Sequence, residues 1–303
     1  MKKVFITGGL GFIGYHLTDF LLNKGIEVVG IDGKVEERRK PEYEMKEMML
    51  LRNANYKQIN SRIEEASLDH LSKDCDTIFH LSSPKVINMK QSSKMIENSL
   101  DCTRKVVEAS KGKVLVHLSS TEVFGTRYGS ITERTPHHPH SNVGKLKSAE
   151  EHILLNRKSD IVKILRLPLV YGPWQPSHHV FQHYFLHHKL PLKYEEEGVN
   201  AHFDAVYVKD VCESIYQAAT RREQSETFNL TSGREGEWQR GVEWCIGDSI
   251  DLHGEKKLRC GISNKQCASK LGFTNITSIE EGLHQQRLHT EKMIAFDPSI
   301  YLT

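Results

Sequence analysis

Short apolar runs alternate along this chain with longer segments in which apolar residues recur every three or four positions. The run Lys2–Thr7 has the composition of a strand, and the segment after it places Leu17, Phe20 and Leu21 on one helical face. A second strand is expected over Ile26–Ile31. This alternation predicts an α/β fold, built as a doubly wound parallel sheet with a smaller α+β lobe.

Size and composition narrow the classes of protein. At 303 residues the chain can bury a full core and divide into two lobes. The formal net charge of +2 is too small to favour nucleic acid as a partner. The six cysteines show no C-x-x-C spacing, which suggests reduced thiols in a cytoplasmic protein. No apolar run is long enough for a membrane span, and the chain opens directly on a strand, so neither a membrane segment nor a signal peptide is expected.

A glycine-rich turn joins the first strand to the first helix. Gly8, Gly11 and Gly14 have G-x-x-G-x-x-G spacing, and Phe12 and Ile13 lie at the start of the helix. Because glycine has no side chain, the backbone can come close to a pyrophosphate, and the N-terminus of the helix favours the negative charge of that group. This strand–turn–helix context predicts a Rossmann-like dinucleotide site.

The second strand ends in an acidic residue, Asp32, which lies 18 residues after Gly14. A carboxylate there can accept hydrogen bonds from both ribose hydroxyls and repels a 2′-phosphate, so the predicted cofactor is NAD. Arg38 and Arg39 lie nearby and leave NADP as a minor alternative.

The segment Pro139–Glu151 resembles P-x-S-P-Y-G-x-S-K-L-x-x-E, the entry to the catalytic helix in the extended short-chain dehydrogenase/reductase family. Lys147 and Glu151 align with the lysine and the glutamate of this pattern, which fixes the register. Val143 stands where the family has its catalytic tyrosine. An isopropyl group cannot move a proton to or from a sugar hydroxyl, so either another residue does this work or the usual oxidation is lost.

Further motifs of the family follow in order along the chain, from Lys3 to about Leu283. They include strings like H-L-A-A (His80–Ser83), R-x-x-x-V-Y-G-P (Arg166–Pro173), V-Y-V-D-D-V (Val206–Val211) and S-L-E-E-G-L (Ser278–Leu283). The resemblance implies NAD as the cofactor and a nucleotide-diphosphate sugar as the substrate. Besides the glycine turn and Asp32, the implied cofactor contacts are Asn60, Leu81, Ser82, Asn98 and Lys147.

The substrate contacts that the resemblance implies are less complete. Ser83 and Val143 occupy substrate-facing positions. Leu169 replaces an asparagine that touches the substrate in many members, and Phe203 replaces an arginine that meets the diphosphate. Because a diphosphate needs a cationic partner, Arg259, shortly before the C-terminal signature, is the candidate for that role.

Ser120, Thr121 and Glu122 lie in a string, Ser119–Gly125, that resembles S-T-D-E-V-Y-G of sugar 4,6-dehydratases and S-T-S-E-V-Y-G of UDP-glucuronate decarboxylases. The resemblance implies that Ser120 binds a sugar hydroxyl and that Glu122 assists the step after oxidation at carbon 4. Thr121 stands where the 4,6-dehydratases have an aspartate that protonates the departing hydroxyl. Threonine is a poor acid, which weakens the standard 4,6-dehydratase assignment.

The leading hypothesis is an NAD-dependent nucleotide-sugar dehydratase of a tyrosine-less type, similar to dehydratases that remove water across carbons 5 and 6 of a nucleotide-linked hexosamine. Lys147 would orient the nicotinamide ribose, Glu122 would take the carbon-5 proton, and Ser120 or Thr121 would hold the 4-hydroxyl. An epimerase or a decarboxylase with a substitute base is the first alternative. A non-catalytic protein that binds NAD and a sugar nucleotide is the second, although it would have little need for both Lys147 and Glu122.

Several side chains are candidates to replace the phenol. His140 lies three residues before Val143, in a polar loop that is expected to be exposed. Tyr171 and Tyr184 are on segments expected near the pocket, but a structural role is favoured for Tyr171.

Three histidines raise the question of a metal. His179, His183 and His187 have i, i+4, i+8 spacing, which would place them on one helical face. No carboxylate or cysteine partner is evident, so no metal site is predicted.

The expected domains are 1–167 plus 205–230 for NAD and 168–204 plus 231–303 for the substrate, with the site between them at the carboxyl ends of the strands. By analogy with the family, the helices at Ser92–Ser110 and Lys145–Arg157 would form a four-helix bundle in a homodimer. Their apolar residues, such as Val106 and Leu154, are equally consistent with packing on the sheet.

Overall fold

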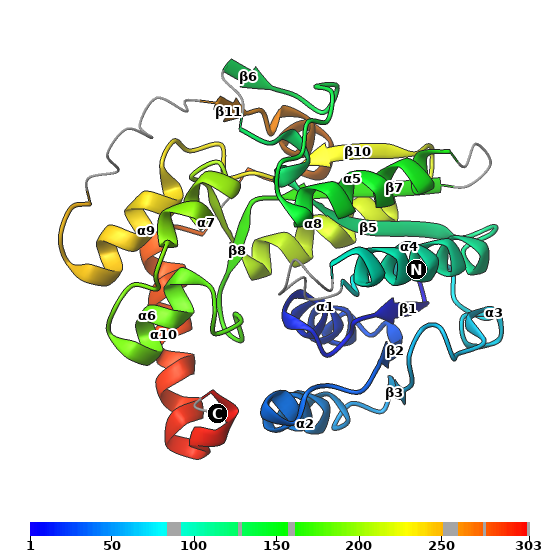
Figure 1. Ribbon diagram of the computed structural model, residues 1–303. Helices are drawn as coiled ribbons and strands as arrows, with labels where there is room; N and C mark the ends of the chain where they lie inside the picture. Colours follow the sequence, from blue (N-terminus) through cyan, green and yellow to red (C-terminus); the bar gives the residue numbers. More distant parts are fainter. Residues whose placement is uncertain (84–91, 127–128, 157–160, 251–259, 275–276, 302–303) are drawn as a thin grey trace. The chain divides into compact units, whose positions relative to one another are not determined.

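The computed structural model of the chain describes residues 1–83, 92–126, 129–156, 161–250, 260–274 and 277–301 (Figure 1). Strands and helices alternate as the sequence predicts, and the α/β fold class is confirmed. Two compact units are present: 1–119, 145–165 and 215–227 form the first, and 120–144, 166–214 and 228–303 form the second. The predicted cofactor and substrate domains stay a prediction, and these units differ from them mainly in assigning 120–144 to the second unit.

The central sheet has seven strands in the order β10-β7-β5-β4-β1-β2-β3. Its strands are β1 (Lys3–Thr7), β2 (Glu27–Asp32), β3 (Tyr56–Asn60), β4 (Thr77–His80), β5 (Val114–Ser120), β7 (Ile161–Leu167) and β10 (Glu226–Asn229). Pairings of β1 with β2 and β4, of β2 with β3 and of β4 with β5 are parallel. The strand order therefore reverses between β1 and β4, and doubly wound sheets bind ligands at the carboxyl ends of strands at such a switch point.

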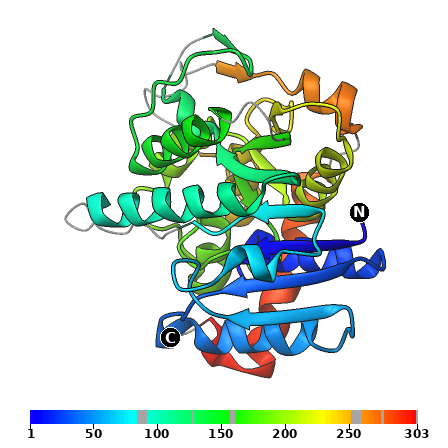
Figure 2. The same cartoon turned by 90° about the vertical axis from the view of Figure 1, so that its right-hand side faces the viewer.

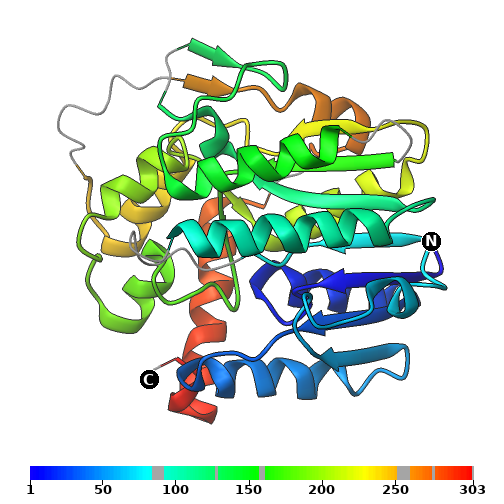
Figure 3. The same ribbon diagram turned by 45° about the vertical axis from the view of Figure 1, so that its right-hand side comes forward.

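Helices cover both faces of this sheet. Those of the first unit are α1 (Phe12–Asn23), α2 (Lys40–Leu50), α3 (Leu68–Leu71), α4 (Ser92–Ala109) and α5 (Asn142–Leu155), and η1 (Glu37–Arg39) precedes α2. The helices α4 and α5 lie side by side on one face (Figure 3), and α1 packs on the other (Figure 2). Alternation along β1 explains this, because Phe5 points to one face while Val4 and Ile6 point to the opposite one.

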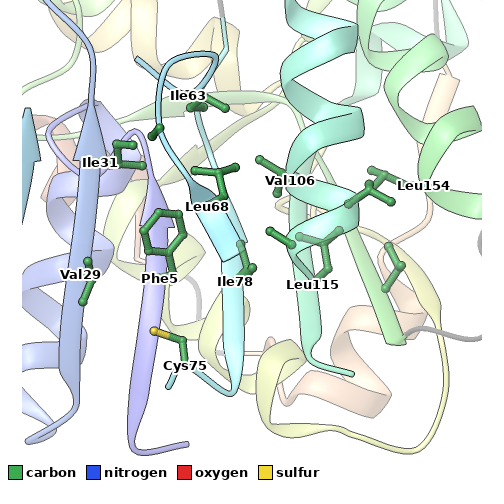
Figure 4. Packing of buried hydrophobic residues seen from close by; sticks show 14 of the residues in the cluster. Phe5, Val29, Ile31, Ile63, Leu68, Cys75, Ile78, Val106, Leu115 and Leu154 are labelled. Atoms are coloured by element: carbon green, nitrogen blue, oxygen red, sulfur yellow. The ribbon is translucent and has the colours of Figure 1, made fainter. Parts of the chain in front are cut away.

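The core beneath α4 and α5 is built from apolar residues of five strands and three helices (Figure 4). Phe5, Ile78 and Leu115 from the strands meet Val106 of α4 and Leu154 of α5, and each of these side chains is almost fully buried. Val106 and Leu154 therefore pack on the sheet and are not available for contacts between subunits. The expected homodimer stays a prediction.

In the part of the second unit that the structure describes there are two small parallel sheets and four helices. The strand β8 (Leu169–Tyr171) pairs with β9 (Ala205–Tyr207), and β6 (Gly129–Ile131) pairs with β11 (Cys260–Ile262). The helices are α6 (Val180–His187), α7 (Tyr194–Asn200), α9 (Glu237–Ile246) and α10 (Ile279–Phe296), and α8 (Val208–Thr220) belongs to both units. The single turns are η2 (Thr121–Phe124), η3 (Cys267–Leu271) and η4 (Pro298–Ile300).

The long helix α10 packs against α6 and α9 (Figure 1). It starts at Ser278, whose hydroxyl accepts a hydrogen bond from the Glu281 amide at 3.2 Å, a standard cap for the first turn. A buried amide network then ties it to α6: Gln286 Nε2 donates to Gln175 Oε1 at 2.8 Å and to Gln182 Oε1 at 2.9 Å. Buried amides whose bonds are satisfied in this way fix the relative positions of the segments that carry them.

The structure also bears on the compositional expectations. None of the helices in the described part of the chain is both long and apolar enough to cross a membrane. Cysteines at 75, 102, 212, 245 and 267 are free thiols. Within the described ranges, no group of three or more histidine, cysteine, aspartate or glutamate residues is arranged to hold a metal ion.

Candidate active site

The turn after β1 has the shape that a pyrophosphate requires. Gly8 has a φ of 78°, and a side chain there would come within 2.9 Å of the Ser82 amide nitrogen. A side chain at Gly14 would collide with the Gly8 carbonyl oxygen. The helix α1 starts at Gly11 without a side-chain cap, so its first amides face the turn. Phe12 begins α1, and this open, glycine-lined helix N-terminus fits the diphosphate of a dinucleotide.

Asp32, at the end of β2, is held ready for a ribose. Its Oδ2 accepts hydrogen bonds from the Leu10 amide at 3.1 Å and from Gln58 Nε2 at 3.2 Å. Gln58 Nε2 also donates to Asn60 Oδ1 at 3.3 Å, so two of the predicted cofactor residues, Asp32 and Asn60, share this amide. Burial raises the pKa of Asp32 to about 7, although the bonds from Leu10 and Gln58 act against this. Ribose hydroxyls would donate hydrogen bonds to the carboxylate and so replace the hydrogen bonds to water that burial removes.

The neighbouring arginines are already engaged with carboxylates. Arg38 Nε donates to Glu36 at 2.6 Å, and Arg39 Nε donates to Glu42 at 3.2 Å. Lys46, which is fully buried, forms a close ion pair with the same Glu42. These pairings leave the arginines less suited to a 2′-phosphate, in agreement with NAD as the cofactor.

The segment after β4 lies beside the glycine turn. Leu81 donates its amide to the Thr7 carbonyl at 3.1 Å, and Ser82 Oγ donates to Thr7 Oγ1 at 3.1 Å. Ser83 is exposed. Ile13, on the first turn of α1, is partly buried. On α4 the predicted contact Asn98 is exposed, while its neighbour Ser99 is buried, so the sequence motif alone does not identify the inward-facing residue.

Lys147 lies in a buried polar network that the sequence did not reveal. Its Nζ donates to Glu150 Oε2 at 2.9 Å, and Ser99 Oγ donates to Glu150 Oε1 at 2.9 Å. His117 Nε2 lies 3.1 Å from Glu150 Oε2, and burial lowers the pKa of His117. Burial raises the pKa of Glu150, but Lys147 and His117 lower it by more than burial raises it. The net pKa of Glu150 is therefore well below the usual range.

The network continues toward the glycine turn through His80. Its Nδ1 lies 2.8 Å from Thr7 Oγ1 and its Nε2 lies 3.1 Å from Thr103 Oγ1. Burial, with the nearby His117, lowers the pKa of His80 to about 3, so this imidazole is neutral. The other expected residue, Glu151, accepts a hydrogen bond from Ser119 Oγ at 2.5 Å and anchors the end of β5.

The second unit carries the catalytic candidates that follow β5. Glu122 Oε2 accepts a close hydrogen bond from Ser141 Oγ, and Ser141 Oγ accepts the Gly144 amide at 2.9 Å. The Glu122 amide donates to Ser120 Oγ at 3.1 Å, which starts η2. Burial raises the pKa of Glu122, while Ser141, His179 and Ser120 lower it in part. The carboxyl group is thus partly enclosed and oriented, as a general acid or base requires.

Other predicted substrate residues are less well placed. Thr121 is fully buried, and among the described residues its hydroxyl has no hydrogen-bond partner. Val143 is 38% exposed, and Leu169 is buried in β8. Phe203 packs on Trp238 with ring centroids 5.8 Å apart, as a core contact would. Arg259 lies outside the described residues.

The three side chains suggested as substitutes for the missing tyrosine differ in burial and in hydrogen bonding. Tyr171 is 1% exposed, its hydroxyl donates to the Ser278 carbonyl at 3.3 Å, and burial raises its pKa, which supports a structural role. His140 is exposed and its Nδ1 accepts the Thr126 amide at 3.3 Å. Tyr184 is partly buried on α6.

The three-histidine face does not form. His179 is the extended residue before α6, with a φ of −77° and a ψ of 145°, and is not on the helix. Its Nδ1 lies 2.9 Å from Glu197 Oε2, so the carboxylate partner that the sequence did not reveal is Glu197. His183 and His187, by contrast, are both on α6, and their rings lie 4.5 Å apart, centroid to centroid, at an angle of 55°.

These features define a dinucleotide-binding α/β protein with a carboxylate and a buried lysine as candidate catalytic groups. A model of the NAD dependent epimerase/dehydratase family matches residues 4–231. The chain belongs to this family, its cofactor is NAD, and the expected relation to extended short-chain dehydrogenases/reductases is confirmed. It is an enzyme of the family, whose reaction type is not fixed by membership.

Curated relatives span most of the chain. A Dictyostelium discoideum sterol-4-alpha-carboxylate 3-dehydrogenase, decarboxylating, is 24% identical over 79% of this chain and 74% of its own length. A Bacillus subtilis protein described as an uncharacterized UDP-glucose epimerase, YtcB, is 25% identical over 99% of each chain. The structure of dTDP-glucose 4,6-dehydratase from Bacillus anthracis with NAD matches with a TM-score of 0.81, 20% identity and coverage of 99% and 100%. This last likeness concerns the fold.

Proposed function

We propose that the chain is an NAD-dependent dehydratase of nucleotide-diphosphate sugars that works without the usual tyrosine. The observation that carries the proposal is the partly buried, oriented carboxyl group of Glu122. Ser141 holds one of its oxygens, and burial raises its pKa. A carboxylate with a raised pKa is a stronger base than an ordinary one, which suits removal of a carbon-bound proton.

The chain's residues divide the chemistry in the following way. Bound NAD would supply the acceptor for the carbon-4 hydride and would return it to carbon 4 at the end, while the proton of the 4-hydroxyl would pass to water and return from it. Oxidation at carbon 4 acidifies the proton on carbon 5, and Glu122 accepts that proton. The Ser120 hydroxyl already accepts the Glu122 amide, so its own hydrogen can be directed at the sugar. Loss of the carbon-6 hydroxyl as water completes the elimination.

In this proposal Lys147 does not act as an isolated positive charge. Its Nζ bonds Glu150, and the charge is compensated inside the first unit. An ammonium has three donors, so a ribose bond can be formed in addition. Lys147 therefore orients the nicotinamide ribose more than it supplies a free positive charge.

An epimerase is the second candidate function. The Bacillus subtilis relative with 99% coverage is described as a UDP-glucose epimerase, which supports a nucleotide sugar as the substrate class and leaves epimerisation open. Four-epimerisation needs hydride transfer and rebinding of the keto sugar, but no proton exchange at carbon 5. The two reactions therefore differ in what solvent deuterium reports.

The proposal is tested with UDP-, dTDP-, GDP- and CDP-sugars in deuterated water, followed by mass spectrometry and NMR. The wild-type protein is expected to release one water per sugar and, through reversible deprotonation, to exchange deuterium into carbon 5 of the recovered substrate. Glu122→Gln should abolish both, whereas Glu196→Gln, an exposed carboxylate of the same unit, should leave both unchanged. An inverted carbon 4 without deuterium at carbon 5 would establish the epimerase instead.

A further inference from the structure

A histidine–carboxylate pair lies in the second unit, which also carries Glu122. His179 Nδ1 lies 2.9 Å from Glu197 Oε2, and Glu197 Oε1 accepts the Val180 amide at 3.2 Å. The amide at the start of α6 thus holds the carboxylate, and the carboxylate holds the ring. A carboxylate on Nδ1–H fixes the imidazole tautomer and presents Nε2 as the nitrogen that exchanges protons.

The backbone on both sides of His179 is fixed by buried amides. Gln175 Nε2 donates to the Val170 carbonyl at 2.9 Å, and the Gln182 amide donates to Gln175 Oε1 at 3.2 Å. Gln286 of α10 bonds both glutamines. The ring of His178 lies 4.3 Å from that of His179, centroid to centroid. A side chain supported in this way keeps one orientation, which catalysis requires.

The segment that carries Glu197 contacts the turn that carries Glu122, because His202, shortly after α7, donates from Nε2 to the Gly125 carbonyl at 2.9 Å. Burial raises the pKa of Glu122 most, His179 lowers it and Glu197 raises it. Ser141 and Ser120 are the other groups that act on Glu122 in this way. His179 is 29% exposed at its side chain and Glu197 22%, so the pair is open to a ligand while partly shielded from water.

We propose that His179, oriented by Glu197, is the acid that takes the place of the aspartate missing at Thr121 and that it works together with Glu122. The inference rests on the proposed dehydration. Glu122 accepts the proton from carbon 5, the electron pair forms the double bond to carbon 6, and the carbon–oxygen bond at carbon 6 breaks. His179 Nε2–H donates its proton to the departing oxygen, which leaves as water. Glu122 then returns its proton to His179, directly or through a water, and both groups are restored.

Other histidines of the second unit fit this role less well. His202 Nε2 bonds the Gly125 carbonyl at 2.9 Å, and burial lowers its pKa. His140 is exposed and bonded to Thr126. The role needs a ring that one carboxylate orients and that has a second carboxyl group nearby for the exchange of protons. In the described part of the second unit His179 has both.

The test compares His179→Gln and Glu197→Gln with His187→Gln, a control on an exposed ring at the end of α6. His179→Gln should lower kcat for dehydration about 100- to 1,000-fold with little change in KM. His179→Gln should still exchange deuterium into carbon 5, since Glu122 performs that step. Glu197→Gln should lower kcat similarly, and imidazole should partly rescue His179→Ala.

The outcomes separate this inference from the proposed function. If the wild-type protein neither dehydrates a sugar nor exchanges carbon 5, the proposed function fails. If the wild-type protein dehydrates and His179→Gln does so equally well, the role of His179 fails alone. A rise in KM with kcat unchanged would assign His179 to anion binding and overturn its role as an acid. Denaturant unfolding of each variant checks that the fold is retained.

Discussion

The ion pair between Lys147 and Glu150 allows a sharp test of the first unit. Nζ and Oε2 are 2.9 Å apart, Glu150 is fully buried and Lys147 is 8% exposed. Lys147→Met removes the charge and keeps the length of the side chain, and Glu150→Gln keeps the shape of the carboxyl group. Each single change leaves one charge buried without its partner, whereas the double change leaves none.

The expected magnitudes follow from burial. Removing one partner of a buried ion pair costs about 3–5 kcal/mol of unfolding free energy, and replacing both by neutral groups costs much less. Ser99 and His117 remain beside Glu150 in Lys147→Met, so that loss should fall at the lower end, about 3 kcal/mol. The coupling energy between the two changes should be about 3 kcal/mol or more, against about 0.3–0.5 kcal/mol for independent sites.

The assay is denaturant unfolding of the four proteins at neutral pH after removal of NAD, because a bound ligand adds its own stabilisation. Glu150 is ionised there: its pKa is depressed in the folded state, so its contribution is present above its ordinary pKa and is lost only in strong acid. Losses that simply add in the double variant would refute the ion pair as described. A double variant of near-wild-type stability that no longer binds NAD would show that Lys147 serves the cofactor and is replaceable for folding.

Three further outcomes are expected. Because burial raises the pKa of Asp32 to about 7 and ribose hydroxyls favour its ionised form, NAD affinity should fall about 10-fold per pH unit below pH 7, and Asp32→Asn should abolish this dependence in calorimetry. Burial lowers the pKa of His80 to about 3, so protons bind the unfolded chain first, and stability should fall by up to about 1.4 kcal/mol per unit as pH drops from about 6.5 toward 3; pH-independent unfolding midpoints would contradict this. Gly144→Ala, whose side chain would strike the Glu122 carbonyl, should cost about 1–3 kcal/mol and most of the activity, while Gly261→Ala, with open space around it, should be tolerated.

The parts of the molecule that contiguous sequence determines were predicted well. The glycine turn requires residues without side chains at three nearby positions, and the structure shows why at Gly8 and Gly14. Asp32 is the last residue of β2, which pairs with β1, the strand that leads into the glycine turn. The family relation, the fold and NAD all follow from such local patterns, because a turn and its flanking elements lie within a few residues of one another.

Contacts between distant segments were not predictable in the same way. Glu151 was expected from the motif, but the neighbouring Glu150 is the residue that binds Lys147, and its other partners come from α4 and β5. No spacing rule relates Ser99 or His117 to Glu150. The burial that makes this network strong exists only after the sheet and its helices have packed.

His179 shows how a correct periodicity can lead to the wrong neighbour. Its i, i+4, i+8 spacing with His183 and His187 holds in the sequence, but α6 starts one residue later. The extended backbone at His179 turns the ring toward Glu197 of α7. A helix boundary, which sequence patterns locate poorly, decided between a row of histidines and a histidine–carboxylate pair.

The segment that lost its tyrosine retains the backbone that orients Glu122. Gly144 lies so close to the Glu122 carbonyl that any side chain there would collide with it, and Ser141 links the Gly144 amide to the Glu122 carboxylate. A protein that merely binds a sugar nucleotide has no need for a carboxyl group held this tightly. The change to Val143 therefore removes one proton carrier while the scaffold that holds Glu122 is kept, and this combination favours a reaction in which oxidation is followed by removal of a carbon-bound proton over one that only moves a hydride.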